Sequence, residues 1–460
     1  MRETLRTGAI LLVILLAVFI PFVSSGYSEL RAAETAPSHT EAAEHYQAAA
    51  LRIPWRPDLY ELAGHHYYYA KEYTAAESAY QKTYQRNALS PDGWAAWGDV
   101  IYWNGDPKGA AEIWEQGLRQ PNASEKLYSR LAQVHQENRE YSKAAQDLQK
   151  YVEANPADAS AHYRLGLLLT LSDPNAASSE LITASQLDPQ FDPAVQTLRT
   201  ALNLSLLRDS PSERLVLAGR GLGLVNEWEL ANAAFEEAVK ADGENAEAWA
   251  WLGEANRQSA GEETLTYLDR ALDLDPNSTV VRGLRGLYFQ RVGNHRQALI
   301  EFQSAAKLEP KNPAWYVSIG EEFSKLGDLI RALEAYQYAT TLVPEDAEYW
   351  RRLAVFSAQN NANVRDVGIP AAQKAVYLAQ QDAPTLDVLG WLLVLDGRYY
   401  EAERILKRAL ESDPQLAEAN FHLALLYLQM GERASAYDHL VEASGLGSEA
   451  AAALLQQEFP

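Results

Sequence analysis

The side chains best suited to chemistry are two adjacent histidines, His65 and His66, with Glu61 one helical turn before His65. Residues four apart on a helix share a face, so Glu61 and His65 could place a carboxylate beside an imidazole. A zinc site needs three or four protein ligands, and no cysteine or His-Glu-x-x-His motif supplies the others. Surface or groove histidines are the favoured interpretation, and we expect no metal and no cofactor.

Other chemical signals have plain structural explanations. The string containing Gly219, Gly221 and Gly223 lacks the preceding strand and the following Lys-Ser/Thr of a phosphate-binding loop. The 62 acidic residues are spread along the chain, so carboxylate pairs arise everywhere and indicate no acid–base site. We therefore expect no enzyme and no catalytic residues.

Composition limits the class of partner. The chain has 460 residues, of which 47% are hydrophobic, enough for a folded protein. Its formal net charge of −22 repels phosphate backbones, so nucleic acid is not an expected partner.

The elements that position any functional side chain are set by an internal repeat. Pro276, Pro310 and Pro344 lie 34 residues apart. Between them the same residue types recur, in the pairs Gly286 with Gly320, Phe289 with Phe323, Gly293 with Gly327, Ala298 with Ala332, Phe302 with Tyr336 and Ala305 with Ala339. The small residues predict two antiparallel helices that cross closely, and the second glycine of each unit predicts a turn with positive φ. The proline ends the second helix.

This pattern resembles the tetratricopeptide repeat family, whose unit is a helix-turn-helix of 34 residues. The resemblance covers nearly the whole chain after the N-terminal segment, with about eleven full units and a half unit. It implies an all-α fold: a right-handed superhelical solenoid of stacked helix pairs, preceded by one N-terminal hydrophobic helix. Among such proteins, we expect a membrane-anchored or exported protein of bacterial type.

The expected organisation has six segments, which are a transmembrane anchor or signal peptide (1–26), a half repeat or linker (27–56), a first repeat array (57–190), an irregular helical spacer (191–211), a second array (212–444) and a C-terminal capping helix (445–460). The spacer is a candidate hinge because Pro193 opens a helical stretch that fits no unit. The last helix would cover the apolar seam that a final repeat leaves open.

The N-terminal segment predicts a location. Basic residues precede an uncharged apolar run at 8–23, and Glu29 follows it. With its flanks the run approaches the roughly 20 residues that span a membrane, and the basic flank places the N-terminus in the cytoplasm and the repeats outside. Small residues before Gly26 also suit cleavage, so a secreted protein is the alternative.

The inner groove of the solenoid is the expected binding surface. In this family certain offsets of each first helix line the groove, and they select two sets of residues here. The early set is aromatic and comprises Tyr68, Tyr69, Tyr102 and Trp103, with Glu61, His65 and Asp99 beside them. The middle set is cationic and comprises Arg257, Arg291, Lys325 and Arg351. The cations could hold an anionic segment, or they could pair with acids of neighbouring helices.

The predicted function is a non-catalytic scaffold for protein–protein interaction. It would be tethered to the membrane through the N-terminal helix, face outside the cytoplasm and assist assembly of an envelope or secretion complex. Its partner would be a peptide segment or an envelope component. The alternative is a glycan-binding solenoid of the cell envelope, in which the early rings stack on sugars.

Overall fold

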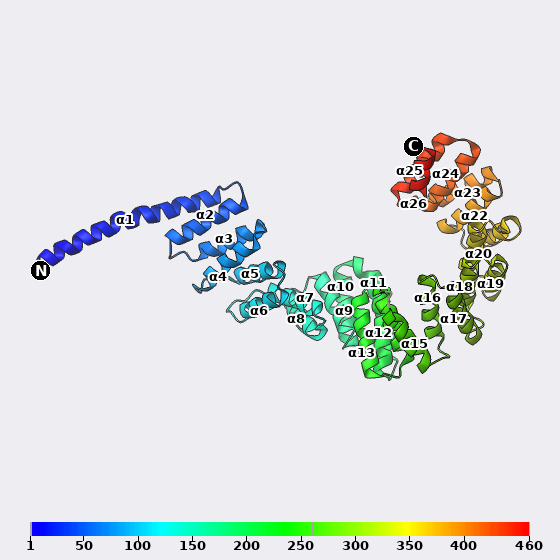
Figure 1. The fold of residues 1–460 in the computed structure, drawn as a ribbon, viewed down its shortest axis with the longest axis horizontal. Helices are drawn as coiled ribbons and strands as arrows, with labels where there is room; N and C mark the ends of the chain where they lie inside the picture. The colour runs from blue at the N-terminus through cyan, green and yellow to red at the C-terminus, as the bar shows by residue number, and fades with distance from the viewer. Residues whose placement is uncertain (1, 260–261, 460) are drawn as a thin grey trace. The chain divides into compact units, whose positions relative to one another are not determined.

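A computed structural model describes residues 2–259 and 262–459, with side chains placed for 16–257 and 263–459 (Figure 1). Throughout these ranges the regular structure is helical, which confirms the all-α prediction. The chain forms two compact units, one of residues 1–209 and 217–231 and the other of residues 210–216 and 232–460.

Successive helices follow one another with short connections. The first unit contains α1 (Arg2–Glu34), α2 (His39–Arg52), α3 (Asp58–Tyr69), α4 (Tyr73–Tyr84), α5 (Pro91–Trp103), α6 (Pro107–Leu118), α7 (Lys126–Glu137), α8 (Tyr141–Ala154), α9 (Ala159–Leu169), α10 (Pro174–Leu187), η1 (Pro189–Phe191) and α11 (Asp192–Leu206). Residues of both units occur in α12 (Pro211–Leu224) and α13 (Trp228–Ala241).

The second unit continues the same alternation of helices. It contains α14 (Ala246–Ala255), η2 (Asn256–Ser259), α15 (Glu262–Leu274), α16 (Thr279–Arg291), α17 (His295–Leu308), α18 (Pro313–Lys325), α19 (Leu329–Leu342), α20 (Ala347–Gln359), η3 (Val364–Gly368), α21 (Ile369–Leu378), α22 (Ala383–Leu395), α23 (Tyr399–Ser412), α24 (Ala417–Met430), α25 (Arg433–Gly445) and α26 (Glu449–Glu458).

The two helices of a repeat cross where the first helix carries a glycine. A Cβ atom added to Gly98 would lie 2.0 Å from the indole nitrogen of Trp114, and one added to Gly286 would lie 2.4 Å from the ring of Phe302. The absence of a side chain lets a large ring of the second helix enter the gap, where it is almost wholly buried. The predicted close crossing of antiparallel helices is confirmed.

In most repeats the turn ends the first helix with a left-handed residue, although the turn between α9 and α10 has none. In the repeat of α16 and α17 this residue is Gly293, with φ of 75°. The amide of Asn294 then donates to the carbonyl of Phe289 at 2.8 Å, as in a Schellman cap. Lys71 and Arg139 adopt the same left-handed conformation in earlier repeats, with φ of 60° and 61°. The turn geometry is therefore kept even where the sequence lacks glycine.

A second recurrent contact closes the connection between repeats. The carbonyl of the residue that ends a repeat accepts a hydrogen bond from a side chain six residues later, in the first turn of the next helix. The donor and acceptor pairs are His162 with Pro156, Trp249 with Gly243, Arg282 with Pro276, Tyr316 with Pro310 and Trp350 with Pro344, at 2.9 to 3.3 Å. This bond satisfies a carbonyl that the helices leave without a partner.

The N-terminal prediction is corrected. α1 runs without a break from Arg2 to Glu34, so the predicted boundary at residue 26 lies inside a helix. Among the residues that were searched, none of the helices is both long enough and apolar enough to cross a membrane. Side chains of residues 1–15, which hold part of the predicted run, lie outside the described ones. The predicted single-pass membrane location was wrong.

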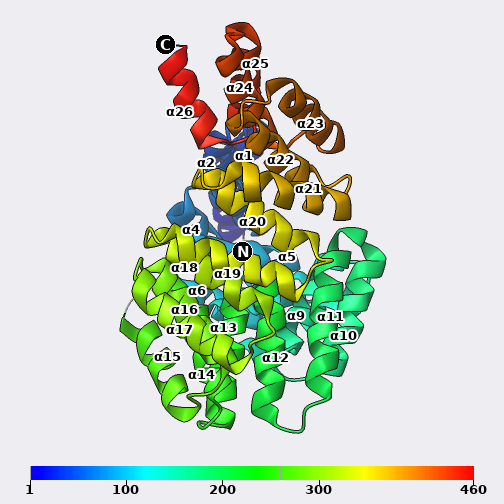
Figure 2. The ribbon, with the colours of Figure 1, turned by 90° about the vertical axis from the view of Figure 1, so that its right-hand side faces the viewer.

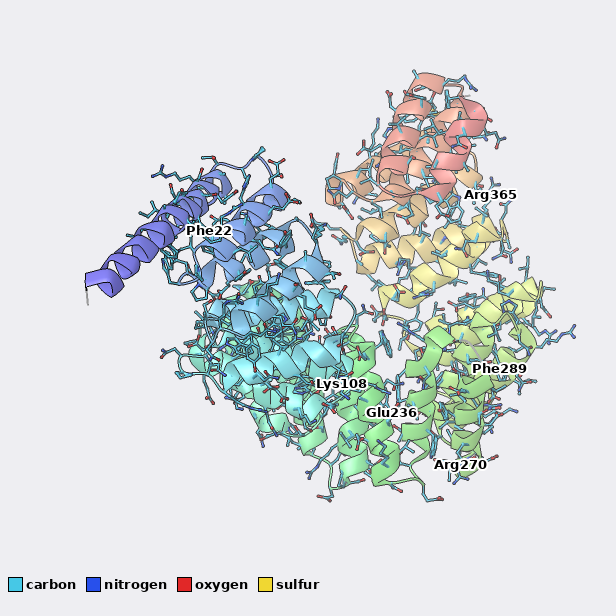
Figure 3. All side chains as sticks on the ribbon, turned by 60° about the vertical axis from the view of Figure 1, so that its left-hand side comes forward. Phe22, Lys108, Glu236, Arg270, Phe289 and Arg365 are labelled. Atoms are coloured by element: carbon cyan, nitrogen blue, oxygen red, sulfur yellow. The ribbon has the colours of Figure 1, made fainter. Side chains whose placement is uncertain are left out.

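Irregular segments interrupt the repeat at two places. The predicted spacer forms η1 and α11, and the ring of Phe191 stacks on Tyr163 with centroids 4.6 Å apart. The turn after α20 is longer than those of the neighbouring repeats and contains the π-helical segment η3. Arg365 of η3, labelled in Figure 3, pairs with Asp396 at 2.8 Å. At the C-terminus α26 lies beside α25 (Figure 2), and Leu454 and Leu455 pack on the core of the last pair.

Candidate functional site: an aromatic furrow in the first unit

Four of the predicted groove residues lie together at the ends of two neighbouring helices. Tyr68 and Tyr69 end α3, and Tyr102 and Trp103 end α5, exactly one repeat of 34 residues later in sequence. The side chains of Tyr69 and Trp103 are 62% and 61% exposed, although buried rings are common elsewhere in this unit. Exposed rings repeated at one offset suggest a contact surface, because aromatic side chains are enriched at interfaces.

Two hollows accompany these rings. One has a volume of about 530 Å³ and is lined by Tyr68, Tyr102 and Trp103, among others. The other has a volume of about 600 Å³ and is lined by Tyr68 and Tyr69. Both include Asp99 and Arg130, so they adjoin along one surface that crosses α3, α5, α7 and α9. We call this surface the furrow.

The floor of the furrow is an ion pair between two successive repeats. A guanidinium nitrogen of Arg130 in α7 lies 2.7 Å from Asp99 in α5, and a second nitrogen also contacts this carboxylate. The hydrogen bond to Asp99 raises the pKa of Arg130 and outweighs the opposing effect of burial. Arg130 therefore keeps its positive charge, and the ion pair ties the first helices of two repeats together.

The rings are held in place by further polar contacts. The hydroxyl of Tyr102 donates to Glu137 at 2.5 Å and accepts from the amide of Gln133 at 3.0 Å. The bond to Glu137 raises the pKa of Tyr102, so the phenol stays protonated at neutral pH. Trp103 stands nearly perpendicular to Tyr102, with an interplanar angle of 85°. Burial raises the pKa of Tyr68, and the nearby carboxylate of Asp99 adds to this rise.

The predicted histidine and carboxylate group serves the packing of helices. Glu61 accepts the amide N–H of Ser90 at 2.8 Å, and His65 contacts the hydroxyl of Tyr80 at 2.8 Å. Burial raises the pKa of Glu61, but hydrogen bonds from His65 and Ser90 outweigh it and lower the pKa overall. Within the described part of the chain, no cluster of three or more His, Cys, Asp or Glu side chains could hold a metal ion.

The predicted cations of the second unit do not form a free ladder. Arg291 binds Glu254 through two bonds of 3.0 and 2.6 Å, and Arg351 binds Glu348 at 2.9 Å. Arg257 is an exposed residue of η2. Lys325 is exposed at the end of α18. Pairing with acids of neighbouring helices, the second interpretation offered by the sequence, describes Arg291, whereas Arg351 pairs with an acid one turn earlier in its own helix.

Sequence reasoning missed several residues of the furrow. Gln133 and Glu137 occupy in α7 the same offsets that Asp99 and Trp103 occupy in α5, so extending the groove rule by one repeat would have found them. Arg130 lies at an offset that the rule omits. Its approach to Asp99, 31 residues earlier in the chain, is visible only in the stacked structure.

Comparison with known families supports the repeat assignment. A model described as tetratricopeptide repeat matches residues 129–180, 217–279 and 317–383. A second tetratricopeptide repeat model matches residues 383–416. The first of these regions contains Arg130, Gln133 and Glu137 of the furrow.

Curated relatives match parts of the chain. A BBSome complex member BBS4 homolog of Drosophila melanogaster is 28% identical over 184 residues, which cover 38% of this chain and 38% of the relative. Superkiller complex protein 3 of Mus musculus is 23% identical over 274 residues, which cover 58% of this chain and 16% of the relative. The chain thus matches well under half of each relative. Neither is a bacterial protein, so the expected bacterial type has no support.

A solved structure has a similar succession of helices. The crystal structure of yeast Tom70 aligns over 97% of this chain and 95% of its own, at 16% sequence identity and a TM-score of 0.42.

Proposed function

We propose that this chain, which contains tetratricopeptide repeats, is a non-catalytic scaffold that binds a partner protein in the furrow of its first unit. The observation that carries the proposal is the gathering of four rings, two of them more than half exposed, around two adjoining hollows. Large rings in concave sites provide most of the binding energy of many interfaces. The BBSome and superkiller relatives are named as members of protein complexes, which agrees with a scaffold.

The hydrogen bonds of the carboxylates in the furrow support binding over catalysis. Asp99 is engaged by Arg130, and Glu137 is engaged by Tyr102 and Gln133. A general acid or base must reach the reacting proton, whereas these carboxylates are already occupied by protein donors. The narrower prediction of an envelope or secretion complex depended on the membrane location and loses its basis with it.

The proposal is tested with a random dodecapeptide library selected on the full chain. The selected peptides are then measured against the double variant Tyr69→Ala/Trp103→Ala and against Tyr400→Ala, which removes a ring that is 82% exposed in the second unit. We expect the double variant to lose about 100-fold in affinity, since each ring contributes on the order of a tenfold effect, and the control to bind as wild type does. Selected peptides that bind the double variant with full affinity would refute the furrow as the binding site.

A further inference from the structure

We propose that the ligand of the furrow is a proline-rich segment of a partner protein in the polyproline II conformation. This inference rests on the proposed function, because it names the class of peptide that the same site takes. Three features of the furrow lead to it: the spacing of its rings, its balance of donors and acceptors, and its net charge.

The spacing of the rings matches the period of polyproline II. That helix has three residues per turn and a rise of about 3.1 Å per residue, so one turn advances about 9 Å. Packed helices lie about 8–10 Å apart, and α3 and α5 are in contact. Successive ring pairs, Tyr68 with Tyr69 and Tyr102 with Trp103, therefore recur at about one turn of such a peptide. Every third residue of the peptide can meet a ring.

The furrow offers guanidinium donors, and two of its carboxylates, Asp99 and Asp158, already accept hydrogen bonds from the protein. Asp158 accepts from the hydroxyl of Tyr151 at 3.1 Å and from the amide of Ala161 at 3.0 Å, while Asp99 is held by Arg130. By contrast, the guanidinium of Arg164 is exposed and presents further N–H groups beyond the one that it donates to Gln136. A proline has a carbonyl acceptor and no N–H, so a proline-rich backbone complements such a surface.

The charge of the furrow favours an uncharged ligand. The acids lining the two hollows are Asp92, Asp99 and Asp158, and the bases are Lys126, Arg130 and Arg164. These three acids and three bases cancel, and Glu137 beside Tyr102 brings the furrow to a formal charge of −1, in a chain whose formal charge is −22. A strongly charged peptide would gain little from this surface, whereas an apolar, preformed proline helix loses little entropy on binding.

The rings also fit a neutral glycan, which would stack its apolar faces on them. A sugar presents many hydroxyl donors and needs acceptors to match, and three of the four carboxylates of the furrow, those of Asp99, Asp158 and Glu137 but not that of Asp92, already accept from protein donors. An unmet polar group costs binding energy. The observations therefore favour the peptide, and the glycan becomes an outcome of the test.

The experiment titrates the full chain with decaproline while following tryptophan fluorescence, with a Gly-Ser decapeptide and a neutral glucose hexasaccharide as parallel probes. We expect decaproline to bind and the other two probes not to bind. Tyr69→Ala and Trp103→Ala should each weaken decaproline about tenfold. Trp103→Tyr should bind decaproline with nearly the wild-type affinity, measured by isothermal titration calorimetry. Tyr400→Ala should leave the affinity for decaproline unchanged.

The possible outcomes separate this inference from the proposed function. If decaproline fails to bind while library peptides without prolines bind the furrow, the polyproline II inference falls and the scaffold proposal stands. If the hexasaccharide binds and decaproline does not, the ligand is a glycan and the inference is overturned. If decaproline binds equally well to the wild type and to the Tyr69→Ala/Trp103→Ala variant, both proposals fail.

Discussion

Replacing Gly98 by alanine should loosen the repeat that carries Trp103. The added Cβ would lie 2.0 Å from the indole nitrogen of Trp114, whose side chain is 2% exposed and donates to the carbonyl of Ala95 at 3.1 Å. Trp114 must move, which costs about 1–3 kcal/mol for overpacking and about 1–3 kcal/mol for the lost bond of a buried donor, less about 1 kcal/mol of helix propensity. The net expectation is a destabilisation of about 1–5 kcal/mol.

Hydrogen exchange measured by mass spectrometry is the appropriate assay, because repeat arrays open locally. Peptides from residues 91–118 should exchange about fivefold faster or more in Gly98→Ala, since about 1.4 kcal/mol corresponds to a factor of ten. Gly445→Ala is the matched control, because no atom lies within 4 Å of its added Cβ and its φ is not positive. Unchanged exchange in Gly98→Ala, or equal acceleration by the control, would refute the close-crossing argument.

Three further predictions concern the second unit. Trp350→Phe removes the donor to the carbonyl six residues earlier and should cost about 1 kcal/mol, seen as faster exchange over 344–359. Arg291→Ala leaves the buried carboxylate of Glu254 unpaired and should lower the urea midpoint by the equivalent of about 2 kcal/mol, whereas Lys325→Ala should change it by less than about 0.5 kcal/mol. Hydrogen bonds from neighbouring side chains lower the pKa of Glu309 in the folded protein. The wild type should therefore be more stable than Glu309→Gln at pH values above the ordinary pKa of 4.5, and this difference should disappear as the pH falls through the lower folded pKa. A stability difference that does not depend on pH would contradict this prediction.

The repeat and much of the site could be predicted from the sequence because both depend on short-range periodicity. Gly286 and Phe302 recur at fixed offsets in the next repeat, and the crossing that they form requires only helices of regular length. The rings of Tyr69 and Trp103 share one offset, and a solenoid brings equal offsets of neighbouring repeats to one surface. The sequence therefore located the rings without knowledge of how far the repeats twist.

Contacts between helices were harder to predict, since they depend on side-chain direction. Arg291 could have faced a ligand or an acid, and only the stacked repeats reveal Glu254 beside it. The hydrogen bonds to the inter-repeat carbonyls were missed for a related reason: the donors are of four different residue types, among them His162 and Arg282, so no single letter recurs. The N-terminal run was judged by its length, its apolar content and its basic flank, which led to the membrane prediction.

The central claim, that the furrow contacts the partner, is tested most directly by site-specific photo-crosslinking of a library-selected peptide. A photoreactive phenylalanine replaces Tyr69 in one variant and Tyr400 in another, and both positions are exposed. The account predicts crosslinks to the peptide from position 69 and none from position 400. Crosslinks from position 400 with none from position 69, at peptide concentrations that saturate both variants, would contradict it.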